Sequence, residues 1–205
     1  WSGGSLWIGR SLAPSELHSH HAIQVCVGLA SSPEFRIDES APWTSYRAAV
    51  IPPDLPHTYQ APGMMVAHLF CEPESALGRG LLAEFGRDRI AGVLWAKIDP
   101  FARALRSAFD AGAADEDLEA IALDTLHALS GHEPAGEADR RIVRATDFIG
   151  LHLAETLSLE DVADHVGLSP GRFRHLFVAE TGISFRAYVL WVGMQRAIEL
   201  GFGRG

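Results

Sequence analysis

The chain has 205 residues, of which 47% are hydrophobic and 21% are charged, and its formal net charge at pH 7 is −9. This length and balance allow one large domain or two small ones, and they exclude a mainly disordered chain. The acidic net charge argues against a protein that coats nucleic acid without specificity. No segment approaches the ~18 consecutive apolar residues of a membrane helix, and the first residues do not resemble a signal peptide.

Cysteine and arginine usage adds two expectations. Cys26 and Cys71 are too few for a disulfide framework, so we expect reduced thiols in a cytoplasmic protein. Of the 17 basic residues only Lys97 is a lysine, and arginine suits bidentate contacts with phosphate or guanine. Residues 137–205 are nearly neutral, with 8 basic and 9 acidic side chains.

Residues 1–75 carry the pattern of short strands. Residues 23–27 and 34–38 alternate between apolar and polar side chains, as half-buried strands do. Further short apolar runs occupy residues 6–8, 46–51 and 66–70. Turns rich in Pro, Gly and Ser separate these runs, which predicts a small antiparallel barrel or sandwich.

After Pro73 the apolar residues follow the period of amphipathic helices. Asp99 and Pro100 are expected to begin one of these helices, with Asp99 as N-cap and Pro100 at the first helical position. Residues 132–136 are interpreted as a short linker to the last third of the chain.

The last third predicts closely spaced helices, the first over about residues 138–153. Ser158 and Asp161 form a capping-box pattern that begins a short helix. Ser169 and Pro170 begin the next helix, as N-cap and first helical residue. Ser184 is expected to cap a final, longer helix.

The segments of this region have a specific pattern. Residues 158–163, 167–170 and 181–188 are Ser-Leu-Glu-Asp-Val-Ala, Gly-Leu-Ser-Pro and Thr-Gly-Ile-Ser-Phe-Arg-Ala-Tyr. The pattern resembles the first helix-turn-helix of AraC-type transcription regulators and the start of their connecting helix. The resemblance covers roughly residues 138–200.

The resemblance implies an α+β architecture in three parts. Residues 1–75 would form a cupin-like antiparallel β-barrel that senses an effector, and residues 76–136 a helical dimerisation and linker segment. Residues 137–205 would form part of an AraC-type DNA-binding domain. The family has a second helix-turn-helix, which is absent before Gly205, and an arginine where this chain has Gly193. The chain is therefore interpreted as a naturally short form or a fragment, and because residues 201–205 do not resemble a continuing helix, natural shortening or a frameshift is favoured. We expect it to bind its operator weakly or not at all at physiological salt.

The resemblance also implies which residues contact DNA. Gly171, Arg174 and His175 occupy base-contacting positions of the motif, and Arg172 lies on the same face near the start of the second helix. Arg174 suits the edge of a guanine. The alternative is an ordinary solvated helix face.

Histidines suggest a second site. His18, His20 and Gln24 share parity, which predicts one face of a single strand, and His57 would approach from a neighbouring strand. They resemble degenerate cupin motifs, in which Gln24 replaces the usual Glu, and imidazole ligands suit Zn, Ni or Fe. The alternative is a metal-free pocket of hydrogen-bonding histidines, while His21 and His68 are interpreted as structural or surface residues.

An organic effector would need apolar surface. Such a pocket is expected to be lined by the aromatic residues Trp7, Trp43, Tyr46 and Tyr59. The alternative is that these side chains are simply core.

The sequence therefore favours a ligand- or metal-responsive transcription regulator that binds promoter DNA and a small-molecule effector as a homodimer, with no catalytic residues. One alternative is a metal-dependent cupin enzyme, a dioxygenase or an isomerase. Another is a shortened regulator that acts by dimerising with other chains.

Overall fold

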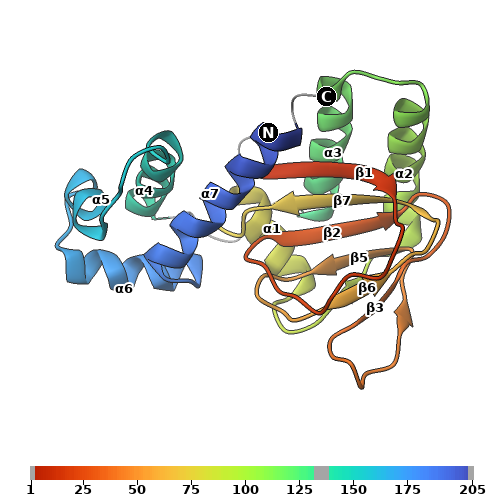
Figure 1. Cartoon of the computed structure of the whole chain (residues 1–205), viewed down its shortest axis with the longest axis horizontal. Coiled ribbons are helices and arrows are strands. Elements are labelled where there is room, and N and C mark those ends of the chain that lie inside the picture. Colours follow the sequence, from red (N-terminus) through yellow and green to blue (C-terminus); the bar gives the residue numbers. More distant parts are fainter. Residues whose placement is uncertain (1–2, 132–138, 203–205) are drawn as a thin grey trace. The chain divides into compact units, whose positions relative to one another are not determined.

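The computed structural model of the chain describes residues 3–131 and 139–202, with side chains as far as residue 197 (Figure 1). It contains two compact units, residues 1–136 and 137–205. The predicted linker at residues 132–136 lies outside the described residues. Among the described residues, no helix is both long enough and apolar enough to cross a membrane.

The first unit is built on a five-stranded antiparallel sheet with the strand order β1-β7-β2-β5-β8. Its strands are β1 (Gly4–Arg10), β2 (Ile23–Gly28), β5 (Ala48–Ile51), β7 (Met65–Cys71) and β8 (Ala91–Gly92). All six residues of β2 are buried, so the predicted half-buried alternation is wrong for this strand. Both faces of β2 are covered, one by helices and the other by a second sheet.

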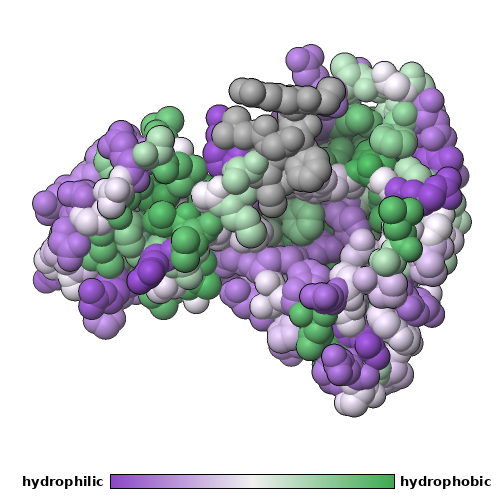
Figure 2. All heavy atoms as spheres, in the orientation of Figure 1, coloured by the Kyte–Doolittle hydropathy of each residue, from purple (hydrophilic) through white to green (hydrophobic). Residues whose placement is uncertain are grey.

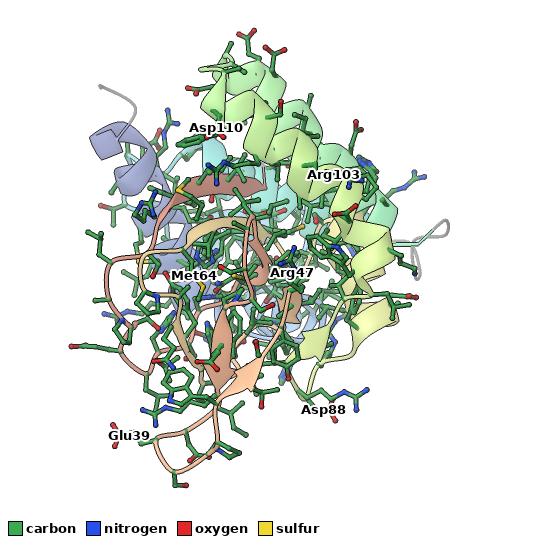
Figure 3. The ribbon with its side chains drawn as sticks, turned by 90° about the vertical axis from the view of Figure 1, so that its right-hand side faces the viewer. Glu39, Arg47, Met64, Asp88, Arg103 and Asp110 are labelled. Carbon is green, nitrogen blue, oxygen red and sulfur yellow. The ribbon has the colours of Figure 1, made fainter. Side chains whose placement is uncertain are left out.

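The second sheet has three short antiparallel strands in the order β4-β3-β6. They are β3 (Glu34–Arg36), β4 (Thr44–Ser45) and β6 (Thr58–Gln60). Phe35 of this sheet packs with Cys26, Ala49 and Ile51 of the larger sheet in one buried cluster. Glu39 lies in the loop that joins β3 to β4 (Figure 3).

Three helices cover the opposite face of the larger sheet. They are α1 (Ala76–Phe85), α2 (Trp95–Asp110) and α3 (Asp115–Leu129). Leu81, Ile98 and Leu126 from the three helices share one buried core with Val25 and Leu69 of the sheet. The segment after residue 75 therefore packs as one layer on the strands, and its strand β8 extends their sheet.

Helix α2 begins earlier than the sequence predicts. It starts at Trp95, so Pro100 lies inside the helix and Asp99 pairs with Arg103 instead of acting as N-cap. An internal proline removes one helical hydrogen bond. The first turn nevertheless forms because Trp95 and Ile98 pack into the core, which offsets that cost.

The second unit is entirely helical within its described residues. It contains α4 (Arg140–Leu151), α5 (Leu159–His165), α6 (Pro170–Thr181) and α7 (Phe185–Phe202). Its core is formed around Phe173, Phe177 and Tyr188. Phe177 packs edge-on against Tyr188, with 5.3 Å between the ring centroids.

The helix ends of this unit follow the predicted signals. Ser158 and Asp161 form the complete capping box of α5, and Pro170 is the first residue of α6. Gly182 ends α6 with a φ of 81°, which glycine adopts without the strain of a side chain. Helix α7 extends to Phe202, so the expectation that residues 201–205 do not continue the helix is wrong for Gly201 and Phe202.

Candidate functional sites

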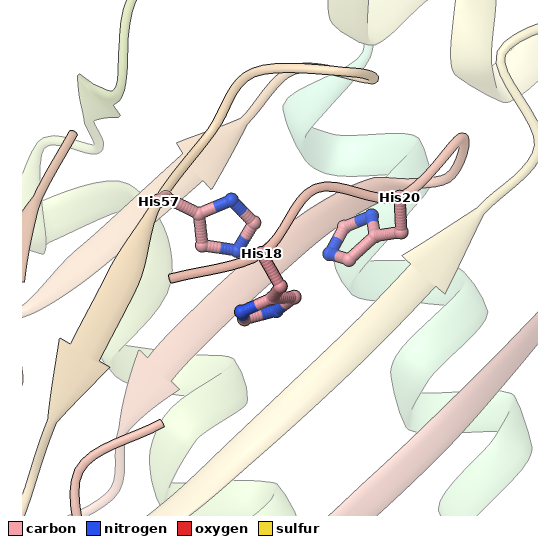
Figure 4. A group of neighbouring side chains, drawn as sticks. All are labelled: His18, His20 and His57. Atoms are coloured by element: carbon pink, nitrogen blue, oxygen red, sulfur yellow. The ribbon is translucent and has the colours of Figure 1, made fainter. Parts of the chain in front are cut away.

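Three predicted metal ligands come together in the first unit. The backbones of His18 and His57 form an antiparallel bridge, with hydrogen bonds of 3.0 and 2.8 Å, and His20 follows two residues later (Figure 4). The ring centroid of His57 lies 4.4 Å from that of His18 and 5.1 Å from that of His20. One ring nitrogen of each histidine can be chosen so that the three lie within 4.8 Å of one another.

The prediction that His18, His20 and Gln24 lie on one strand is wrong. Only Gln24 lies on β2, whereas His18 and His20 precede that strand. The bridge to His57 and the bend after His20 bring the rings together. The convergence is therefore a tertiary feature and not a consequence of residue parity.

Hydrogen bonds to the backbone fix the tautomers of the three rings. The Nδ1 atoms of His18, His20 and His57 lie 2.8, 2.9 and 2.9 Å from the carbonyl oxygens of Glu16, Ala22 and Leu55. A carbonyl oxygen only accepts, so each Nδ1 carries the proton and donates it. In the neutral rings the lone pair then lies on Nε2, which is the arrangement of metal-binding histidines.

Gln24 brings an oxygen to the same place. Its Oε1 lies 2.9 Å from Nε2 of His20 and 3.3 Å from Nε2 of His57. With Nδ1 of each ring donating to the backbone, these Nε2 atoms and the Gln24 oxygen can together bind a cation.

Burial keeps His20 and His57 neutral. It lowers the pKa of His20 below its usual value and that of His57 to about 4, and the neighbouring histidines lower both further. Neutral imidazoles and an amide oxygen suit Zn, Ni or Fe. The residues present therefore fit a divalent transition metal.

His68 is a site residue that the sequence interpretation missed. It lies on β7, where its Nδ1 accepts a 2.8 Å hydrogen bond from the Nε2 amide of Gln24. Burial is the main reason that its pKa falls to about 4. A polar residue within the apolar run at residues 66–70 is the signal that could have indicated a buried role.

His21 is buried too, but its partners differ. Its Nε2 lies 2.6 Å from Oε1 of Glu74, and its Nδ1 lies 3.8 Å from Oδ2 of Asp54. Burial lowers the pKa of His21, but the hydrogen bond to Glu74 and the charges of Glu74 and Asp54 outweigh it and raise the pKa. This contact ties the chain before β2 to the segment that leads into α1.

The predicted aromatic residues occupy different surroundings. The rings of Tyr46 and Tyr59 each lie 6.0 Å from that of Phe35, between the two sheets. The guanidinium carbon of Arg36 lies over the ring of Trp43, 4.6 Å from the centroid of that ring. Trp7, on β1, is 37% exposed and is the register partner of His68.

The predicted DNA-contacting residues share an exposed face of α6. Gly171, Arg172, Arg174 and His175 all lie in its first two turns and are exposed. A groove beside them is lined by Leu168, Gly171, Arg172, His175, Leu176 and Arg141 of α4. Figure 2 shows polar and apolar residues interspersed on the visible face of this unit.

Comparisons with known proteins match this unit by sequence. Residues 151–190 match the profile of the family described as bacterial regulatory helix-turn-helix proteins, AraC family. The regulatory protein PocR of Salmonella typhimurium strain LT2 is 45% identical over 61 residues, which are 30% of this chain and 19% of PocR. The match thus spans about a fifth of that relative.

Solved structures are similar in fold to the chain as a whole. ToxT from Vibrio cholerae O395 aligns with a TM-score of 0.59 and 6% identity, over 100% of this chain and 85% of that chain. A wild-type ToxT from strain SCE256, bound to an unsaturated fatty acid, aligns with a TM-score of 0.56 and 8% identity, over 98% and 81%. At these identities the similarity is one of fold, and it confirms strands and helices followed by a helical unit.

Proposed function

Residues 151–190 form an AraC-family helix-turn-helix, and we propose that the chain is a ligand- or metal-responsive transcription regulator that binds promoter DNA through it. The observation that carries the proposal is the exposed polar face of α6 within that motif. In a helix-turn-helix, the second helix enters the major groove and its N-terminal residues contact base edges.

Four residues are proposed for DNA recognition. Arg174 would form a bidentate contact with a guanine, and Gly171 would allow the backbone to approach the DNA closely. His175 and Arg172 would contact bases or phosphates from the same face, beside the groove that Arg141 lines.

The first unit is proposed as the sensor. His18, His20, Gln24 and His57 would hold a divalent ion such as Zn, Ni or Fe through their ring nitrogens and the amide oxygen. A small-molecule effector is proposed to bind beside this site, where Tyr59 lies against His68 with 5.0 Å between the ring centroids. The other predicted pocket residues, Trp7, Trp43 and Tyr46, lie in different surroundings. That the similarly folded ToxT has been solved with a fatty acid supports a small organic ligand for this fold.

Signalling requires that the ligand bind one arrangement of the protein better than another, because only differential affinity shifts an equilibrium. The proposal includes homodimerisation through residues 76–136 and a cytoplasmic location. It also includes the absence of catalysis, since the sequence match is to regulators.

The enzyme alternative, a cupin dioxygenase or isomerase, is not favoured by the comparisons. The histidine cluster is the feature that would support it. Oxygen consumption or isomer formation by the metal-loaded protein, abolished in His57→Ala, would favour it over the regulator.

DNA binding tests the proposal. The full chain is titrated against labelled fragments of its own promoter by fluorescence anisotropy, at two salt concentrations, with and without Zn. We expect sequence-specific binding that weakens as salt rises. The affinity for DNA should also differ between the Zn-loaded and the metal-free chain. Arg174→Ala should lose about 1–3 kcal/mol and relax the preference for one base.

The matched control is Arg103→Ala, which removes an exposed arginine from α2 in the other unit and should leave DNA affinity unchanged. Equal affinity of the wild type for promoter and unrelated DNA, at both salt concentrations, would contradict the proposal.

A further inference from the structure

No negatively charged ligand belongs to the histidine cluster within the part of the chain that the structure describes. Among the described residues, the group that could hold an ion contains His18, His20 and His57 but no carboxylate or thiolate. The fourth candidate ligand, Gln24, contributes a neutral amide oxygen. The nearby carboxylate Glu74 is engaged by His21, with 2.6 Å between Oε1 and Nε2.

His68 holds the amide in this role. Its Nδ1 accepts the amide hydrogen bond from Gln24 at 2.8 Å, which turns the Gln24 oxygen toward His20 and His57. Gln24 is only 2% exposed, so water does not compete for its amide group. His68 is therefore a positioning residue that holds the Gln24 carboxamide against the cluster, where Gln24 can offer a ligand atom without a charge.

This ligand set leaves the charge of a divalent ion uncompensated. His57 and Gln24 are buried, and an unpaired charge in buried surroundings is costly. An anion that binds beside the ion removes that cost. His18 is exposed, so the cluster has a side from which such an anion can enter.

We propose that the loaded site binds a small anionic ligand, a carboxylate or a similar oxyanion, and that this anion is the effector. The proposal rests on the metal site of the proposed function. It names the chemical class of the ligand. It also assigns Gln24 as the residue that makes the site prefer anions, because its amide carries no charge.

The substitution Gln24→Glu tests the assignment, because it supplies the missing charge from within at nearly constant volume. Like charges a few ångströms apart repel strongly at the modest effective dielectric of a protein. The variant is therefore expected to retain the metal and to lose anion affinity. Gln195→Glu, the same substitution in α7 of the other unit, is the matched control.

The experiment uses the full chain loaded with Co(II), whose visible spectrum reports ligand exchange at the ion. Sodium azide and sodium acetate are titrated as anionic probes, with acetamide as the neutral probe. We expect spectral changes with both anions and at least about tenfold weaker binding of acetamide. Azide should bind at least about tenfold more weakly to Gln24→Glu and unchanged to Gln195→Glu.

The outcomes separate the claims. A chain that takes up no Co(II) overturns the metal site and this inference together, but leaves the DNA-binding proposal standing. A loaded chain that binds acetamide as well as acetate, or a loaded Gln24→Glu that binds azide as well as wild type does, overturns the inference alone. If Gln24→Glu does not fold, as judged by circular dichroism, the comparison of acetate with acetamide on the wild type decides whether the site prefers anions.

Discussion

The three histidines of the cluster each use one ring nitrogen for a backbone carbonyl, and this determines what the other nitrogen can do. With Nδ1 of His18, His20 and His57 donating, the lone pair of each neutral ring lies on Nε2, the atom proposed as metal ligand. Gln24 adds an oxygen, which His68 orients from behind. The proposed metal ligands are therefore already held in place by hydrogen bonds within the chain.

Removal of one ligand should reveal the metal. Wild-type protein dialysed against Zn, Ni or Fe(II) is expected to hold about one ion per chain by elemental analysis. His57→Ala should lower the affinity by at least about 10–100-fold, because loss of a direct ligand costs no less than loss of a supporting residue. His127→Ala, which changes an exposed histidine of α3, should retain the full content. Protein that stays metal-free with all three ions would contradict the prediction.

Acid should destabilise the metal-free protein in a defined window. Burial lowers the pKa of His57 and His68 to about 4 in the folded chain, whereas the value in the unfolded chain is near 6.5. The unfolded state then binds more protons between these values, so the stabilising contribution is fully present above pH 6.5 and is lost as the pH falls toward 4. The loss should be of the order of 1–3 kcal/mol.

Urea unfolding in EDTA at pH 7 and pH 4.5 measures this loss. His68→Gln should reduce the difference between the two pH values, whereas His127→Gln, the exposed control, should not. A free energy of unfolding that rises on acidification would contradict the assignment of buried neutral histidines.

At the scale of elements, local signals determine the helix ends of the second unit. The backbone N–H of Asp161 donates to Oγ of Ser158 at 3.1 Å, and the backbone N–H of Ser158 donates to the carboxylate of Asp161 at 3.1 Å. Two donors at the start of α5 that have no partner within the helix are thereby satisfied. Ser169 occupies the same N-cap position before α6 but makes no such side-chain bond.

The two serines make a matched pair for mutation. Ser158→Ala should destabilise the second unit by about 1 kcal/mol, because it removes the hydroxyl that accepts from the backbone N–H of Asp161 and donates to the Asp161 carboxylate. Ser169→Ala should change its stability by less than about 0.5 kcal/mol. Thermal unfolding of each variant, together with amide exchange at Asp161, measures the two changes in stability. Equal effects of the two substitutions would argue against the capping box.

At the scale of the whole molecule, the helices after residue 75 use their apolar faces within the first unit. Leu81, Ile98 and Leu126 are fully buried against the sheet. The outer side of α2 carries Arg103 and Asp110 (Figure 3), each in an ion pair with a residue of the same helix. A dimer through this segment would therefore use outer surfaces, where Leu94 and Phe109 are the exposed large apolar side chains.

The dimer remains a prediction. Light scattering at micromolar concentration should give about twice the chain mass of 22.2 kDa. Phe109→Ser should shift the chain toward the monomer if the outer face of α2 is the interface, because burial of a phenylalanine contributes about 1.5–3 kcal/mol. Val143→Ser, at an exposed position of α4, is the control. A monomeric mass at every concentration would contradict the prediction.

Features that depend only on neighbouring residues could be predicted from the sequence alone. Capping at Ser158, the glycine stop at Gly182 and the apolar periodicity of the helices are local, so the helix-turn-helix and the exposed face with Arg174 could be predicted. Short apolar runs and turn residues also predicted most strands of the larger sheet, although the alternation expected for β2 was wrong.

The start of α2, the full burial of β2 and the histidine cluster could not be predicted, because local periodicity does not specify burial or long-range contacts. Trp95 and Ile98 pack into the core and start α2 ahead of Pro100, and coverage on both faces buries every residue of β2. The histidine cluster depends on the bridge between His18 and His57, 39 positions apart in the sequence. The role of His68 depends on β7 pairing with β2, which places it beside Gln24, a pairing that no local pattern specifies.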